Sequence, residues 1–157
     1  MAVRERTMAI LDSQIIANSN LFIRDLLIAN VTDPQTGKRG TNESFVMTSY
    51  PSKPVHYPII TVKNTGFSAR RSGMNTEEVM VALTKEIRVW ARAEDSKDQL
   101  TDNVINVLRT EQQDADGTIN EQLHDFEVTS VVPVDEEGAS GIKSAVISVT
   151  YNYPTGQ

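Results

Sequence analysis

The stretch of residues 79–93 constrains the fold of this chain more than any other. Apolar side chains occupy almost every second position there, and Lys85 is the one charge among them. A period of two is typical of a β-strand with one buried face. Fully extended, the stretch would reach roughly 50 Å, which is roughly two to three times the length of a usual strand. We therefore expect a long central strand with a bend or bulge near Lys85.

Two helices are predicted on either side of this region. Residues 7–30 carry the broad apolar stripe of an amphipathic helix, formed by Ile15, Ile16, Phe22, Ile23, Leu26 and Leu27. This helix has to end before Pro34, because the residue before a proline avoids the α region. Ser96 is predicted to cap the second helix, with Gln99 at the spacing of a capping box. Its apolar face continues to about Thr110.

The remaining strands are short apolar or alternating runs. They cover residues 45–50, 59–63, 126–134 and 145–153. Pro133 indicates that its strand lies at a sheet edge or contains a bulge, and residues 64–76 are predicted to form a long loop. The order is helix, three strands, helix, two strands. We predict one α+β domain over residues 1–157, with a mainly antiparallel sheet of about five strands and two helices packed on one face.

Composition narrows the classes of function. The chain has 157 residues, no cysteine and a net charge of -6. Thiol catalysis and cysteine-ligated zinc are excluded, and non-specific attraction to nucleic acid is not expected. No stretch approaches the roughly 20 apolar residues of a membrane span, and no signal peptide is recognised. We expect a soluble intracellular product without membrane contact.

Two stretches partly match ligand-binding loops. Residues 112–123 follow the spacing of a calcium loop, but Gln112 stands at the first ligand position and Leu123 replaces the closing glutamate. A polar turn is therefore the better interpretation. Near Lys38, a phosphate loop fails because Arg39 stands where Ser or Thr would hold magnesium.

The two histidines, His56 and His124, are each isolated in the sequence. Neither has a neighbour at the spacing of a metal ligand, and there is no G-x-S-x-G elbow for a serine nucleophile. Surface or packing roles are expected for both. We predict no catalytic residue, no cofactor and no metal site.

Compact basic pairs are the best candidates for contacts with a partner. They are Lys38 with Arg39 and Arg70 with Arg71, each placed in a predicted loop. Solvated loop charge is the simpler interpretation, whereas ion pairing with a partner or neighbouring subunit is the more specific one. Trp90 and Arg92 lie on the more polar face of the central strand, and Trp is also a residue that anchors interfaces. These six residues form the predicted interface.

Several segments together resemble the tail terminator (tail completion) proteins of long-tailed phages and related archaeal viruses. They are the end of the first helix at residues 26–30, the Tyr-Pro-Ile-Ile-Thr-Val of residues 57–62, the strand-helix unit of residues 87–92 and 100–104, and the closing strand at residues 146–151. The resemblance spans nearly the whole chain. It is one of pattern and order, without a diagnostic fingerprint.

The resemblance implies a non-enzymatic virion protein that is assembled in the host cytoplasm. Such subunits form a hexameric ring that caps the tail tube, stops tube polymerisation and joins the tail to the head connector. The implied partners are further copies of the chain, the tail tube protein and the head-completion or connector protein, with DNA passing through the lumen without specific binding. The alternatives are another neck or tail protein, a small peptide-binding module that uses a free sheet edge, and a small enzyme.

Overall fold

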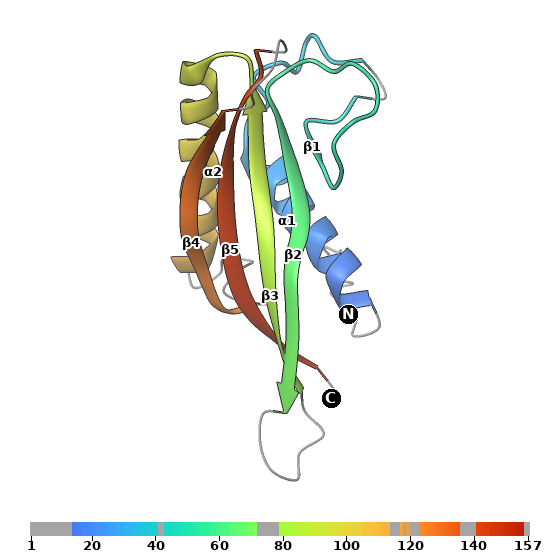
Figure 1. The fold of residues 1–157 in the computed structure, drawn as a ribbon, viewed down its shortest axis with the longest axis vertical. Helices are drawn as coiled ribbons and strands as arrows, with labels where there is room; N and C mark the ends of the chain where they lie inside the picture. The colour runs from blue at the N-terminus through green and yellow to red at the C-terminus, as the bar shows by residue number, and fades with distance from the viewer. Residues whose placement is uncertain are drawn as a thin grey trace, which may run out of the picture.

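The computed structural model describes residues 14–40, 43–71, 79–113, 117, 119, 123–135 and 141–155. In chain order, these residues form α1 (Ile15–Asn30), β1 (Val46–Met47), β2 (Ile59–Arg71), β3 (Val79–Ala91), α2 (Glu94–Gln113), β4 (His124–Asp135) and β5 (Lys143–Thr155). The five strands make one sheet in the order β1-β2-β3-β5-β4. Short β1 runs parallel to β2, and the other neighbours are antiparallel. Both helices cover the same face of this sheet (Figure 1). The predicted α+β class is thereby confirmed.

The core lies between the sheet and the two helices. The alternation in β3 turns Val81, Leu83, Ile87 and Val89 toward the helices, and all four are buried. The apolar stripes of the two helices, which their sequences predict, pack against these side chains. They are formed by Phe22, Ile23, Leu26 and Leu27 of α1 and by Leu100, Val104 and Leu108 of α2. Burying a side chain of this size stabilises a fold by about 1.5–3 kcal/mol. The period-two pattern of β3 therefore sets the position of both helices.

The irregularity expected near Lys85 is present, but in the neighbouring strand. The register between β2 and β3 shifts between Asn64, which pairs with Lys85, and Gly66, which pairs with Thr84. A Cβ atom at Gly66 would lie 3.2 Å from the Cβ of Thr84, so beside the bulge the Thr84 side chain lies against a residue that has no side chain.

Helix α2 begins earlier than its sequence signal suggests. It starts at Glu94, two positions before the predicted cap Ser96, so the predicted cap and capping box are wrong. Glu94 and Asp95 lie in the first turn, where their negative charge complements the helix dipole. For α1, the described helix begins at Ile15 and ends at Asn30, before Pro34 as predicted. The earlier part of the predicted helix, up to residue 13, lies outside the described residues.

Strand lengths differ most from the prediction in β2. The pattern predicts a strand at residues 59–63 and a loop at residues 64–76, but β2 continues to Arg71 in a ladder with β3. The loop prediction is wrong for residues 64–71, because pairing with long β3 supplies the hydrogen bonds that the weak local pattern does not specify. Residues 72–78 lie outside the described part. The strand predicted at residues 45–50 is reduced to the two residues of β1.

Candidate assembly interface

Two strands have an edge that no described strand covers. At one side of the sheet, β4 pairs with β5 alone. At the other side, β1 covers β2 at Ile60 and Thr61, which leaves β2 open toward Arg71. Figure 1 shows the end of β2 extending beyond both helices. Unpaired backbone N–H and C=O groups along such edges can pair with a strand of another chain.

Exposed apolar side chains occur on both edges. Phe67 on β2 is 51% exposed, and Val131 and Val132 on β4 are 42% and 50% exposed. Single exposed apolar residues are common on protein surfaces. Here they coincide with open backbone edges, and β-branched and aromatic side chains favour strand pairing. Pro133 lies on the same edge strand and pairs in regular register with Ala145, so of the edge or bulge that the sequence predicts there, the edge is confirmed.

The two basic pairs do not lie together. Lys38 is exposed in the turn after α1, where its backbone N–H donates to the carbonyl of Gln35. Arg70 is exposed on β2 opposite Met80, and Arg71 is the last residue of that strand. Figure 1 shows the turn after α1 at the opposite end of the sheet from the end of β2. Arg70 thus belongs to an open strand edge rather than to a loop.

Arg39 is engaged inside the chain. Its side chain is 5% exposed, and its Nε donates to Asp33 Oδ2 at 2.7 Å. The other guanidinium nitrogens donate to Glu43 and to the carbonyls of His56 and Pro58. Charge-assisted bonds of this kind are roughly twice as strong as neutral ones. Arg39 therefore ties the turn after α1 to the segment that leads into β2, which is an internal structural role.

Trp90 lies on the face of the sheet opposite the helices. Its indole Nε1 donates to Thr61 Oγ1 at 3.0 Å, and the side chain is largely buried. The guanidinium of Arg88 lies 4.1 Å from the ring centroid, and the ring of Tyr50 packs against it with centroids 4.8 Å apart. Trp90 thus fastens the segment after β1 to the sheet.

Arg92 contributes to the same fastening from the end of β3. Its guanidinium lies 5.2 Å from the ring centroid of Tyr57. The hydroxyl of Tyr57 shares a hydrogen bond with that of Tyr50. The structure therefore brings Trp90 and Arg92, which the sequence predicts at an interface, to one aromatic and cationic cluster that holds the chain between β1 and β2.

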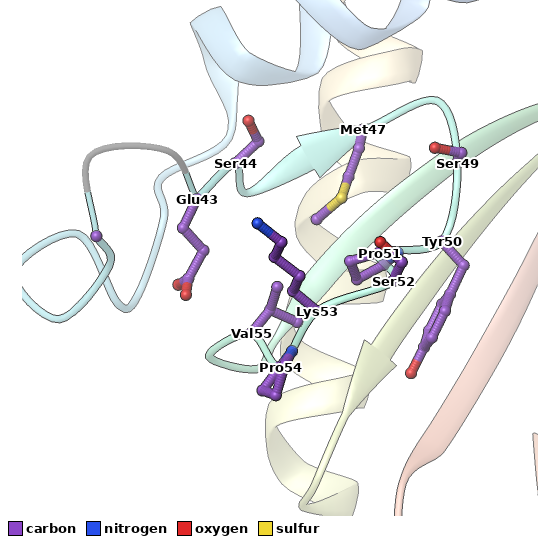
Figure 2. A pocket seen from close by; sticks show the side chains of 11 residues that line it. Glu43, Ser44, Met47, Ser49, Tyr50, Pro51, Ser52, Lys53, Pro54 and Val55 are labelled. Carbon is purple, nitrogen blue, oxygen red and sulfur yellow. The ribbon is translucent and has the colours of Figure 1, made fainter.

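The segment between β1 and β2, with the turn before β1, also borders an open hollow of about 620 Å³ (Figure 2). It is lined by Gly40, Glu43, Ser44, Met47, Ser49, Tyr50, Pro51, Ser52, Lys53, Pro54 and Val55. The Glu43 carboxylate is already engaged, because His56 Nδ1 lies 3.0 Å from its Oε2 and Arg39 lies beside it. The volume is that of a small-ligand site, but its lining mixes prolines and serines with one ammonium group and gives no catalytic constellation.

The remaining candidates for chemistry have ordinary surroundings. His56 is half-exposed against Glu43, and His124 is exposed at the start of β4. Gln112 belongs to α2, and its Nε2 donates to the carbonyl of Phe126 at 2.7 Å. Most of the predicted turn after it lies outside the described residues. In the part of the chain that the structure describes, no three His, Cys, Asp or Glu side chains gather as a metal site would require, and no helix is long and apolar enough to cross a membrane.

Comparison with known proteins adds no assignment. No protein-family model matches the chain, and a search of curated proteins gives no match. Phe67 and Val131, which the sequence did not single out, are exposed on the two open edges. The local signal for Phe67 was weak, because Phe67 is the only strand-favouring residue at positions 67–71 and Gly66 before it is typical of a loop.

Proposed function

We propose that this chain is a virion structural protein whose copies join edge to edge into a hexameric ring. The ring caps the tail tube, stops tube polymerisation and joins the tail to the head connector. The observation that supports this function best is the pair of open edges, β4 on one side of the sheet and β2 on the other. The tail-terminator resemblance of the sequence supplies the place in the virion.

The two open edges differ from each other, which determines the kind of assembly they favour. A contact between β4 of one copy and β2 of the next is head-to-tail, because each copy uses a different surface on each side. Head-to-tail contacts give a closed ring when the rotation between copies closes and a filament when it does not. A ring of about six copies is the closed form that we propose.

The proposed ring has the tail tube protein on one face and the head-completion or connector protein on the other. DNA passes through its lumen without specific binding. The described charges agree with weak interaction with nucleic acid, because the helix-free face mixes Lys63, Glu86 and Arg88 instead of presenting a basic stripe. The whole chain also carries a net charge of -6, which disfavours attraction to phosphates. Binding to DNA depends mainly on basic groups that meet phosphates.

Mass photometry of the purified protein, followed by averaged electron micrographs, tests the proposal. We expect a ring of about six copies whose population grows with protein concentration. When the ring is added to polymerising tube protein, tube growth should stop at the capped end. A chain that remains monomeric, alone and on tubes, contradicts the proposal. If such a monomer instead binds an extended peptide along β4, the peptide-binding alternative is favoured.

A further inference from the structure

A groove of about 410 Å³ lies between the first half of α2 and the edge strand β4. It is lined by Glu94, Lys97, Asp98, Thr101, Val131, Pro133 and Ala145. Val131 and Pro133 pair with Ile147 and Ala145 of β5, whose side chains are buried on the helix side, so the floor of the groove belongs to that face. An apolar floor beside an open edge is an unusual surface to leave in water.

Phe67 is the complementary feature on the opposite edge. It pairs with buried Leu83 of β3, so its side chain lies on the helix-bearing face, yet it is 51% exposed at the β2 edge. When two sheets join edge to edge, their faces continue across the junction. The ring of Phe67 then lies on the same face as the groove of the next copy, and the groove is large enough for one aromatic ring.

We propose that Phe67 of one copy occupies the groove between α2 and β4 of the next copy, in an antiparallel register that places Phe67 opposite Val131. The occupant is thus a second copy of this chain. This inference depends on the proposed ring and specifies its contact. In the sheet order, β2 and β4 point in opposite directions, so β2 of one copy meets β4 of the next as an antiparallel pair.

The proposed register also places two opposite charges, those of Arg70 and Glu127, across from each other, although only Phe67 and Val131 were used to define it. The β4 ladder skips one residue between Val128 and Ser130. The skipped residue is Thr129. When Thr129 is not counted, Glu127 is three positions from Val131, just as Arg70 is three positions from Phe67. The proposed register therefore places Arg70 opposite Glu127. Arg70 is exposed and Glu127 is exposed, and their partners Met80 and Thr150 place both on the helix-free face. Opposite charges directly across a strand pair stabilise it, and like charges destabilise it.

The register requires neighbouring copies to be staggered. Within one copy, Phe67 pairs with Leu83 of β3, which in turn pairs with Tyr151 of β5. Val131 instead pairs with Ile147 of β5. The two positions are four residues apart along β5, which is roughly 13 Å at ~3.3 Å per residue. A sheet that closes on itself needs tilted strands and a fixed stagger of this kind. The offset is therefore compatible with a closed ring.

Disulfide trapping tests the register directly, because the natural chain has no cysteine. A chain carrying Phe67→Cys and Val131→Cys should form covalent dimers and higher ladders on oxidation, since opposite Cβ atoms in a strand pair lie ~4.5–5.5 Å apart. The matched control pairs Phe67→Cys with Val132→Cys. Val132 is similarly exposed but lies on the other face, so cross-linking should be at least about tenfold slower. Equal cross-linking of both pairs, or of neither in an assembled ring, overturns the inference.

Charge exchange gives an independent test. Arg70→Glu and Glu127→Arg should each weaken assembly by about tenfold or more, and the double variant should restore it. Arg109→Glu, which changes an exposed charge on α2, should assemble like the natural chain. Rings that assemble normally in both single variants overturn this register and leave the proposed function in place. A natural chain that forms no ring overturns both.

Discussion

Lys85 and Arg39 both have buried cationic side chains, but only Arg39 is hydrogen-bonded to carboxylates. Arg39 has two carboxylates and two carbonyls around its guanidinium. Lys85 is fully buried at the centre of β3, where its Nζ donates to Asn20 Oδ1 at 2.6 Å, and among the described residues it forms no ion pair with a carboxylate. Burial disfavours the charged form of an amine and lowers the pKa of Lys85 from 10.5 to about 8.

Replacing Lys85 should therefore stabilise the protein at neutral pH. Because the pKa of Lys85 is lower in the folded chain, the unfolded chain binds more protons between pH 8 and 10.5, and folding free energy becomes more favourable as pH rises through that window. Lys85→Met should raise the free energy of unfolding at about pH 7 by on the order of 2 kcal/mol. The gain should shrink at about pH 9.5. Urea denaturation at both pH values measures it, and a gain that does not change with pH contradicts the argument.

Replacing Arg39 should have the opposite effect on stability. Arg39→Ala leaves the Asp33 and Glu43 carboxylates without their cation, and we expect a loss of about 2–4 kcal/mol in the free energy of unfolding. Arg39→Lys should recover little, because an ammonium cannot reproduce the planar fork. Lys38→Ala, one residue away and exposed, should change stability by less than about 0.5 kcal/mol. Similar urea midpoints for Arg39→Ala and Lys38→Ala would refute this role.

Among the elements, the segment between β1 and β2 depends on side chains rather than on backbone pairing. Arg39 donates to its carbonyls, Arg92 lies over the ring of Tyr57, and the ring of Tyr50 packs on Trp90. Regions held by few contacts open locally without global unfolding. The stable part is the long β2–β3–β5 ladder, whose pairs run almost without interruption.

Tyr50→Ala should loosen this segment while leaving the sheet intact. The variant loses the ring contact with Trp90 and the hydrogen bond to Tyr57. Amide hydrogen exchange over residues 48–57 should accelerate by about tenfold or more, while β3 and β5 keep their protection. Tyr50→Phe keeps the ring and should lie between the two. Uniform acceleration across the sheet would show that Tyr50 supports the whole fold instead.

At the scale of the whole molecule, the described residues put all helical cover on one face and leave both sheet edges open. A free, apolar edge is a risk of aggregation for a monomer, and natural proteins blunt such edges with charges, prolines or bulges. β4 carries Pro133 and two register shifts, yet keeps Val131 and Val132 exposed. The ring proposed above would pair these open edges between neighbouring copies.

A charge on the β4 edge should block the proposed ring without unfolding the chain. Val132 is 50% exposed, so Val132→Lys removes little buried area, and we expect a change of less than about 0.5 kcal/mol in stability. The lysine should oppose strand addition, leaving monomers in mass photometry. Val132→Thr keeps the branched shape and should assemble. Normal rings from Val132→Lys would exclude β4 as the joining edge.

The period of two in β3 and the stripes in α1 and α2 are local consequences of which side chains avoid water, so the sequence alone determined the α+β class, the helical face and most of the core. It could not determine that residues 64–71 continue β2, because Gly66 and Asn64 favour a loop locally and only the ladder with β3 overrides them. Arg39 likewise looks like loop charge until the fold brings carbonyls from distant residues around it. Long-range pairing decided which edges stay open, since an edge exists only once every strand has found its neighbour.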